Sequence, residues 1–251
     1  MAKRDAIVEY LNKYLESDKI KDGSRNGLQV EGKEEVKKIV LGVSASAELF
    51  RLAAGEAADM VIVHHGMIWD NPNRITGTFY KRVKLLLDND ISLAAWHLPL
   101  DMHPVDGHNA RLIRFFGATG ITSFCDYHGQ LIGFKGTLKK PVTLHEACDI
   151  LGDNIGGEPV AFGFGPKMIR TIGVVSGGSS GMVLSGECDG LDLYIAGDCA
   201  EPVQEYCREA GLNFISGGHY NTEKPGILAL KDLLAKKFGV RTVFIDVPNR
   251  F

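Results

Sequence analysis

The sequence predicts an α/β protein of two related lobes, each a mostly parallel or mixed sheet flanked by helices. Short apolar runs alternate with segments of helical periodicity, which is the pattern of a largely parallel sheet with helices packed on it. The 30 glycines among 251 residues suit many tight turns between strands and helices. The order of strands in the first half also recurs in the second half, as an internal pseudo-repeat.

The elements of the first half alternate after an N-terminal helix. Ile7, Leu11 and Leu15 form a helical apolar stripe. Ser46 is a preferred N-cap and Gly117 a preferred helix terminator, so these two residues mark a helix start and a helix end. We expect helices over residues 3–15, 46–58, 79–89 and 109–116, and strands over residues 36–43, 60–63 and 91–96.

The second half repeats the strands of the first. The segment VLGVS at residues 40–44 matches IGVVS at residues 172–176. The segment ADMVIVHHG at residues 58–66 lines up with LDLYIAGDC at residues 191–199, at nearly the same offset in numbering. A repeat of this kind predicts two copies of one supersecondary arrangement. The predicted lobes are residues 1–125 and residues 126–251.

Each half also carries a histidine followed at the fourth position by an acid. His97 and Asp101 follow the strand ISLAAW, and they align with His219 and Glu223 at one shared offset. Because this offset is smaller than that of the preceding strands, the first half has a short additional segment, which we place within residues 67–78. The two lobes are therefore related but not identical.

Composition and patterning exclude several classes of protein. The net charge is −3 and no basic block is present, so we expect no nucleic-acid partner. The N-terminus lacks the apolar core of a signal peptide, and no run approaches the roughly 18 apolar residues of a membrane span. The five cysteines are odd in number and no pair has C-x-x-C spacing. We expect reduced thiols in a cytoplasmic protein that does not associate with membranes.

Residues with metal-binding side chains follow three of the predicted strands. MVIV leads into adjacent histidines, and ISLAAW and NFISGG each lead into a histidine and an acid. Ligands collect at the carboxyl ends of strands in open α/β sheets, and imidazoles and carboxylates bind borderline divalent ions well. We therefore predict a metal site. The candidate ligands are His64, His65, Asp101, His219 and Glu223, with His97 as a sixth candidate.

The adjacent histidines allow two arrangements. Successive side chains of a strand point to opposite faces, so His64 and His65 join one cluster only if the strand ends there, and Gly66 permits such a turn. Otherwise each histidine takes its own metal, which suggests two ions and a carboxylate that bridges them. The simplest alternative is a pair of solvated loop histidines. Pro99 argues against a regular helix, so we expect a loop over residues 97–101.

The charge of such a site indicates the class of its ligand. Two divalent ions bring a charge of about +4 and two carboxylates about −2, which leaves a site of about +2. A site of this charge attracts an anionic small molecule such as a phosphate or a nucleotide, and its metals supply an activated nucleophile. No thiolate is among the candidates, which argues against a closed structural zinc site. Zinc, iron, manganese and cobalt all remain open as the metal.

Other polar features have simpler interpretations. The glycine-rich loop SGGSSG at residues 176–181 follows a strand, and its amides either cradle a phosphate or form structural turns. Asp198 is at the position equivalent to His65 in the repeat and is expected not to be a ligand. The remaining histidines are expected to be ordinary surface or hydrogen-bonded residues, and only the two nearest Asp101 are close enough in sequence to reach a substrate. They are His103, His108, His128 and His145.

Four motifs in this order resemble the Nif-three-like family, whose members are GTP cyclohydrolase I type 2 homologues. They are NGLQVEG at residues 26–32, VIVHHG at 61–66, HLPLD at 97–101 and SGGHYNTE at 216–223. The resemblance spans nearly the whole chain and corresponds to the short form of the family, without an inserted domain. It implies a two-lobed α/β fold, a dinuclear metal centre and a toroidal homohexamer whose metals face an internal cavity. By this resemblance the metal ligands are His64, His65, Asp101, His219 and Glu223.

The residues and the resemblance together predict a dinuclear metal-dependent hydrolase with two divalent ions per chain. Its expected substrate is nucleotide-like or phosphorylated, as for a GTP cyclohydrolase type 2-like or phosphoesterase-like enzyme. His97 is expected to serve as a sixth ligand, as a partner that orients a ligand, or as the general base. The alternative is a metal-binding or regulatory protein without turnover.

Overall fold

The chain packs as two compact units, and each is described separately. The computed structural model describes residues 1–70 and 74–250. The first unit contains Met1–Leu100 and Gly226–Pro248, and the second contains Asp101–Pro225 and the residues that follow Pro248. The additional segment expected within residues 67–78 is described only in part, because residues 71–73 lie outside the described residues.

The first unit is built on a five-stranded sheet of order β13-β4-β5-β6-β2. Strands β13, β4, β5 and β6 are parallel neighbours, and β2 runs antiparallel to β6. A short antiparallel pair, β1 and β3, joins the N-terminus to the segment before β4. The bounds are β1 Ala2–Lys3, β2 Gly27–Val30, β3 Glu35–Val36, β4 Lys38–Ser44, β5 Met60–His65, β6 Ser92–Ala95 and β13 Arg241–Phe244.

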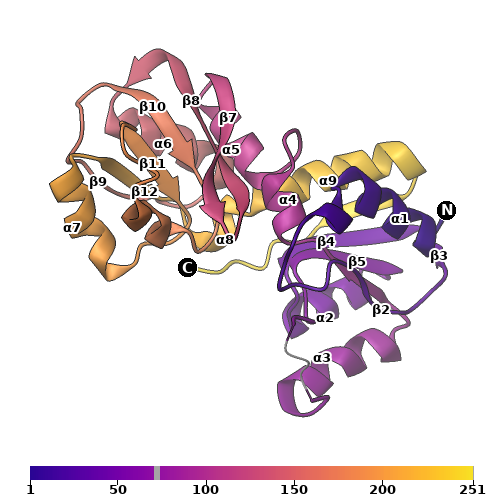
Figure 1. The fold of residues 1–251 in the computed structure, drawn as a ribbon. Helices are drawn as coiled ribbons and strands as arrows, with labels where there is room; N and C mark the ends of the chain where they lie inside the picture. Colours follow the sequence, from indigo (N-terminus) through magenta and orange to yellow (C-terminus); the bar gives the residue numbers. More distant parts are fainter. Residues whose placement is uncertain (71–73, 251) are drawn as a thin grey trace. The chain divides into compact units, whose positions relative to one another are not determined.

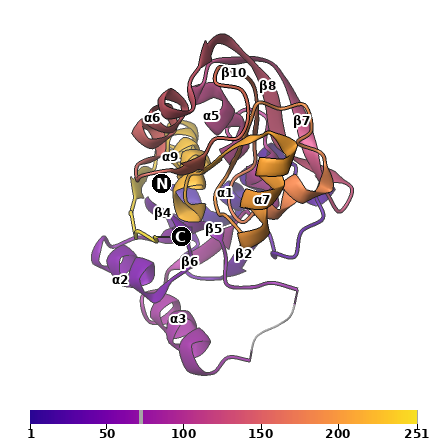
Figure 2. The same ribbon diagram turned by 90° about the vertical axis from the view of Figure 1, so that its left-hand side faces the viewer.

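Helices cover both faces of this sheet. Helices α1 and α9 pack on one face, and α2 and α3 lie side by side on the other (Figures 1 and 2). The 3-10 helix η1 follows α1, and the short helix α4 follows β6. The bounds are α1 Arg4–Tyr14, η1 Ser17–Lys19, α2 Ala47–Gly55, α3 Gly77–Asp88, α4 Leu98–Met102 and α9 Lys224–Phe238.

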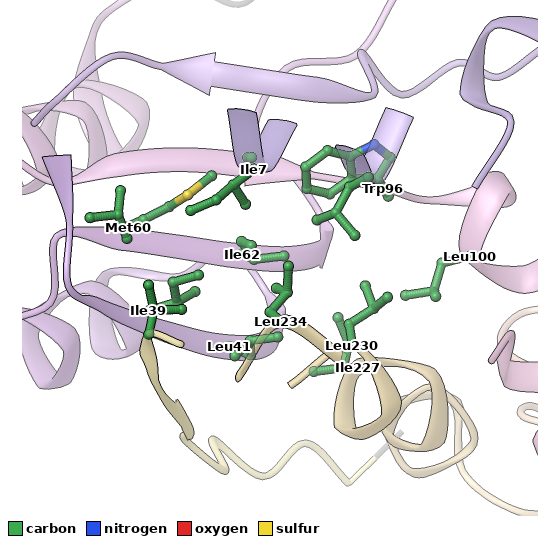
Figure 3. Close-up of a cluster of buried hydrophobic side chains, with 14 of the residues drawn as sticks. Ile7, Ile39, Leu41, Met60, Ile62, Trp96, Leu100, Ile227, Leu230 and Leu234 are labelled. Atoms are coloured by element: carbon green, nitrogen blue, oxygen red, sulfur yellow. The ribbon is translucent and has the colours of Figure 1, made fainter. Parts of the chain in front are cut away.

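Strict alternation along the strands creates the two cores of the first unit. Ile39 and Leu41 of β4 point toward α1 and α9, where Figure 3 shows them with Leu230. Val40, between them, points to the opposite face and packs with Phe50 of α2. Because β4 and β5 are apolar on both faces, they form the continuous apolar runs expected of buried parallel strands.

The second unit contains a six-stranded mixed sheet of order β7-β8-β10-β11-β12-β9. Strands β10, β11 and β12 are parallel, and β7, β8 and β9 run antiparallel to their neighbours. This confirms the predicted fold class of mixed α/β units. The bounds are β7 Ala118–Tyr127, β8 Gln130–Val142, β9 Val160–Phe162, β10 Ile169–Val174, β11 Leu193–Ala196 and β12 Asn213–Ser216.

Helices α5 and α6 pack on one face of the second sheet through a single apolar cluster. Helix α6 begins with a capping box: the Thr143 hydroxyl accepts from the Glu146 amide, and the Glu146 carboxylate accepts from the Thr143 amide. The bounds are α5 His108–Phe115, α6 Leu144–Ile155, η2 Ser180–Ser185, α7 Glu201–Ala210 and α8 His219–Thr222.

The C-terminal segment packs with the first unit rather than with the second. Strand β13 pairs in parallel with β4, and Ile227, Leu230 and Leu234 of α9 enter the core that also contains Ile7 of α1. The predicted lobes, 1–125 and 126–251, describe how the two halves of the sequence are related, and they stay a prediction. Packing divides the chain differently because long-range strand pairing brings residues 226–248 back to the first sheet.

The two sheets repeat the same strand register. In the first unit Ile39 of β4 pairs with Met60 of β5. In the second unit Ile172 of β10 pairs with Leu193 of β11, and the two paired residues are the same number of positions apart in the chain as Ile39 and Met60. The following parallel strands, β6 and β12, occupy the same place in their sheets. The pseudo-repeat seen in the sequence is therefore also a repeat of hydrogen-bonded pairing.

At the start of each repeated strand pair, an aspartate carboxylate accepts hydrogen bonds from two backbone amides. In the first unit the Asp59 carboxylate accepts from the amides of Lys37 and Lys38 at 2.8 and 3.0 Å. In the second unit Asp192 occupies the equivalent position, and its carboxylate accepts in the same way from the two amides at residues 170–171, at 2.7 and 2.9 Å. Each carboxylate thus satisfies two backbone donors that precede or begin a central strand.

The loop predicted over residues 97–101 is wrong, because α4 begins at Leu98. Pro99 lies in the first turn of this helix, where a backbone N–H has no intrahelical partner and its loss carries no penalty. The Leu100 amide donates to the His97 carbonyl at 2.8 Å. Within the described part of the chain, no helix is both long and apolar enough to cross a bilayer.

The contribution of Asp59 to stability can be tested directly. Burial raises the pKa of Asp59, but hydrogen bonds from Lys33 and from the amides of Lys37 and Lys38 outweigh it and hold the pKa below the ordinary 3.8. We expect Asp59→Asn to lower the free energy of unfolding by about 1–3 kcal/mol at neutral pH. Because the folded pKa is depressed, this contribution is present above the unfolded pKa and is lost as pH falls through the folded value.

Urea denaturation of the wild type and Asp59→Asn from about pH 7 down to about pH 3 measures this difference. The matched control is Asp88→Asn, which removes an exposed ion pair with Lys84 on α3 and should change stability by less than about 0.5 kcal/mol. A difference between the wild type and Asp59→Asn that stays constant over this pH range would contradict the assignment.

Candidate metal centre

Three imidazoles come together in the first unit. One ring nitrogen each from His64, His65 and His97 lie within 4.8 Å of one another. The ring centroids of the adjacent His64 and His65 are 4.5 Å apart, although the strand would place them on opposite faces. Strand β5 ends at His65, as the first of the two predicted arrangements requires. Whether the two histidines share one metal ion or each take their own stays a prediction.

Each ring is held through Nδ1. His64 Nδ1 lies 3.1 Å from the Trp96 carbonyl oxygen, and His97 Nδ1 lies 2.9 Å from a carboxylate oxygen of Asp22. Both of these oxygens only accept, so both Nδ1 atoms carry the proton and Nε2 keeps the lone pair. His65 Nδ1 lies 3.1 Å from the Ser44 hydroxyl, which is able to accept a hydrogen bond from it in the same way. Three Nε2 atoms offered in this way form a donor set that suits a divalent ion.

Gln29 holds the segment that follows the histidine pair. Its side-chain oxygen accepts from the amides of Met67 and Ile68 at 2.7 and 3.1 Å. Gly66 has to be a glycine because a Cβ there would collide with the Gln29 amide and with the Ala95 side chain. Gln29 of the NGLQVEG motif therefore holds the loop that follows β5.

The second unit contains its own group of candidate ligands, a histidine and two carboxylates. His219 Nε2 and a Glu223 carboxylate oxygen are 3.2 Å apart across α8. The Asp101 carboxylate accepts from the Ser176 hydroxyl at 2.9 Å, and one of its oxygens lies within 4.8 Å of a ring nitrogen of His108. His108 was expected to be an ordinary histidine, and its place beside Asp101 makes it a further candidate. The spacing between Asp101 and His108 follows no metal-binding motif, so the sequence did not single this pair out.

The glycine-rich loop at residues 176–181 supports these carboxylates. Its amides are used within the fold: Gly177 donates to the Thr222 hydroxyl at 3.1 Å, and Ser180 donates to the Asp198 carboxylate at 2.8 Å. The Ser179 amide also donates to the Gly177 carbonyl. These contacts support the structural interpretation of the loop, and one oxygen of Asp198 is used by the Ser180 amide.

The other histidines have local partners. His103 accepts from the Asp106 amide at 3.0 Å, and the His128 ring packs against Tyr127. His145 is 87% exposed on α6 and lies 3.7 Å from Asp149, as expected for a surface residue. Among the described residues, none of the groups able to hold a metal includes a cysteine. The donor set therefore consists of imidazoles and carboxylates, which fits zinc, iron, manganese or cobalt.

The fold and these side chains define a class of protein. Each unit has central parallel strands flanked by helices, and histidines and acids that can hold metal follow the ends of those strands. The chain belongs to the DUF34/NIF3 family: the family model described as Duf34/NIF3 (NGG1p interacting factor 3) matches residues 2–250. This confirms the resemblance inferred from the four sequence motifs.

Similar proteins cover the chain from end to end. A Pyrococcus horikoshii protein named GTP cyclohydrolase 1 type 2 homolog is 40% identical over 247 residues, which are 98% of each chain. An Archaeoglobus fulgidus protein of the same name is 38% identical over 243 residues, 97% of each chain. The solved structure of protein ybgI, described as of unknown function, is 38% identical with a TM-score of 0.93 and covers 100% of both chains.

A pair of glycine substitutions tests the support of Glu223. Gly177 has a φ of 66°, and a Cβ there would collide with the Glu223 carboxylate. We expect Gly177→Ala to destabilise the metal-free protein by about 2–4 kcal/mol, from the left-handed backbone and the displaced side chain. The matched control is Gly178→Ala, because a Cβ at Gly178 would lie 3.5 Å from the His219 ring, which is an ordinary contact. Denaturation curves that do not distinguish the two variants would contradict this account.

Proposed function

We propose that this protein is a dinuclear metal-dependent hydrolase of a nucleotide-like or phosphorylated substrate. The observation that carries the proposal is the convergence of three histidine nitrogens within 4.8 Å of one another in the first unit. In the second unit, the 3.2 Å approach of His219 to Glu223 adds support. The proposed ligands of two divalent ions per chain are His64, His65, Asp101, His219 and Glu223.

The donor chemistry supports a catalytic rather than a closed structural site. Structural zinc sites are commonly built from thiolates, whereas imidazoles with carboxylates are typical of sites that keep a position open for substrate. When bound, the metals would act as Lewis acids and activate water. The chain would hold the imidazoles as Nδ1–H tautomers, hold the carboxylates through Ser176 and the loop around Gly177, and present His97 as a sixth ligand or as a general base.

Charge and kinship support the substrate class. Two divalent ions with two carboxylates leave a positive site that favours an anionic small molecule. The relatives named GTP cyclohydrolase 1 type 2 homolog make a purine nucleotide the first substrate to test. Purine ring opening and phosphoester hydrolysis have the same requirement, a Lewis acid next to an activated water.

Metal content and activity together test the proposal. The wild type should bind two divalent ions per chain by elemental analysis and hydrolyse GTP, another nucleotide or a generic phosphoester. His65→Ala and Glu223→Ala should each lose at least one ion and reduce turnover by about 100-fold or more, because each removes a ligand. The matched control is His145→Ala, an exposed histidine that should retain both ions and full activity.

The outcomes separate the candidate functions. Two bound ions without turnover on any of these substrates would favour a metal-binding or regulatory protein. A large loss of melting temperature on chelation, with no activity, would indicate a structural metal. Absence of metal after expression in metal-replete medium would refute the metal centre itself.

We also propose that the protein is a cytoplasmic toroidal homohexamer. Membership of the family supports this assembly, and the reduced cysteines expected from composition support the location. Light scattering coupled to size-exclusion chromatography should give a mass six times the 27.3 kDa of one chain. A dimer or monomer at micromolar concentration would contradict the assembly without affecting the metal proposal.

A further inference from the structure

A buried aspartate in the first unit has four hydrogen-bond donors around it. The Asp22 side chain is 3% exposed. One carboxylate oxygen lies 2.9 Å from His97 Nδ1 and accepts from the Ser24 amide at 3.0 Å. The other accepts from the Leu98 amide at 2.9 Å and from the Asn26 side chain at 3.0 Å. A carboxylate with two donors at each oxygen has one orientation only, so it offers His97 a fixed acceptor.

The ring of His97 is also fixed by its other neighbours. The Asn26 side-chain oxygen accepts from the His97 backbone amide at 2.8 Å, so the backbone and the ring are anchored by the same short segment. The Trp69 ring meets the His97 ring edge to face, with centroids 5.0 Å apart. The centroid of the His64 ring is 4.9 Å from that of His97, and the centroid of the His65 ring is 5.6 Å from it. These contacts leave Nε2 as the nitrogen that His97 offers to the other two histidines.

We propose that Asp22 is a positioning residue that locks His97 as the Nδ1–H tautomer, with Nε2 presented to His64 and His65 before any metal binds. A neutral imidazole otherwise exchanges between two tautomers, and only the one with a lone pair on Nε2 can act at the cluster. The tautomer itself depends only on contacts within the first unit. Its consequence for metal binding rests on the proposed function.

The surroundings of Asp22 predict what an isosteric amide would do there. An asparagine side chain has to place its NH2 group at one of the two oxygen positions. At the position facing Leu98 and Asn26 the NH2 group would meet two donors, whereas at the other position it would meet only the Ser24 amide and the His97 ring. The second orientation is preferred, and there the NH2 group donates to Nδ1. Asp22→Asn should therefore reverse the tautomer and place the proton on Nε2.

Solid-state NMR of 15N-histidine-labelled, metal-free protein tests this directly. At a pH of about 8.5 an ordinary imidazole is neutral, and its two nitrogens report which one carries the proton. The signals of His97 are assigned by their loss in His97→Gln. We expect a protonated Nδ1 in the wild type and a protonated Nε2 in Asp22→Asn. A protonated Nε2 in the wild type, or an unchanged tautomer in the variant, would overturn the proposal.

Two controls separate positioning from general structural support. Asn26→Ala removes the bond to the His97 backbone and one of the four donors to Asp22, but it keeps the carboxylate oxygen that faces Nδ1, so it should lower stability and leave the tautomer unchanged. Asp88→Asn, on the exposed face of α3, should change neither. Metal titration of the same variants provides the second measurement: Asp22→Asn should weaken binding at least tenfold. If the wild type binds no metal, the proposed function fails while the NMR result still decides the role of Asp22.

Discussion

A neutral histidine has a free lone pair on only one of its two ring nitrogens, and the histidine cluster of the first unit depends on this constraint. Three imidazoles can share one metal ion only if each is held with a nitrogen lone pair facing inward. The protein holds the three rings with three different partners at Nδ1, which are the Trp96 carbonyl, the Ser44 hydroxyl and the Asp22 carboxylate. Ser44 is the last residue of β4 and Trp96 directly follows β6, so two of these partners are positioned by the sheet.

The second unit has to hold two acidic side chains, Asp101 and Glu223, in buried positions. Ser176 donates to Asp101, and the Gly177 backbone leaves the room that the Glu223 carboxylate occupies. Thr222 ties the loop to α8 by accepting from the Gly177 amide. The position of the Glu223 carboxylate therefore depends on the absence of a side chain at Gly177, which is a structural reason for a glycine in this loop.

Local sequence patterns predicted the elements and most of the candidate site, and long-range pairing accounts for what they missed. The repeat, the helix start at Ser46 and the strand that leads into the histidine pair depend on neighbouring residues, so they could be predicted. The return of β13 to β4 joins segments that are far apart in the sequence, and no periodicity encodes such pairing. Asp22 was missed for the same reason, because its partner His97 is distant in sequence. The loop expected around Pro99 failed because a proline in a first helical turn has no effect on hydrogen bonding.

The aspartates at the starts of the repeated strands have a consequence for how such a protein can diverge. Asp59 and Asp192 accept backbone hydrogen bonds at the end of each sheet where β5 and β11 begin. The histidine pair lies at the opposite end of β5. Alignment of the two copies is thus secured away from the residues that would do chemistry. The second copy has Gly197 and Asp198 where the first has the two histidines, yet its strands pair in the same register. The residues at the ends of these strands can therefore change without disturbing the pairing of the sheet. This makes the repeated unit a favourable starting point for acquiring new activities.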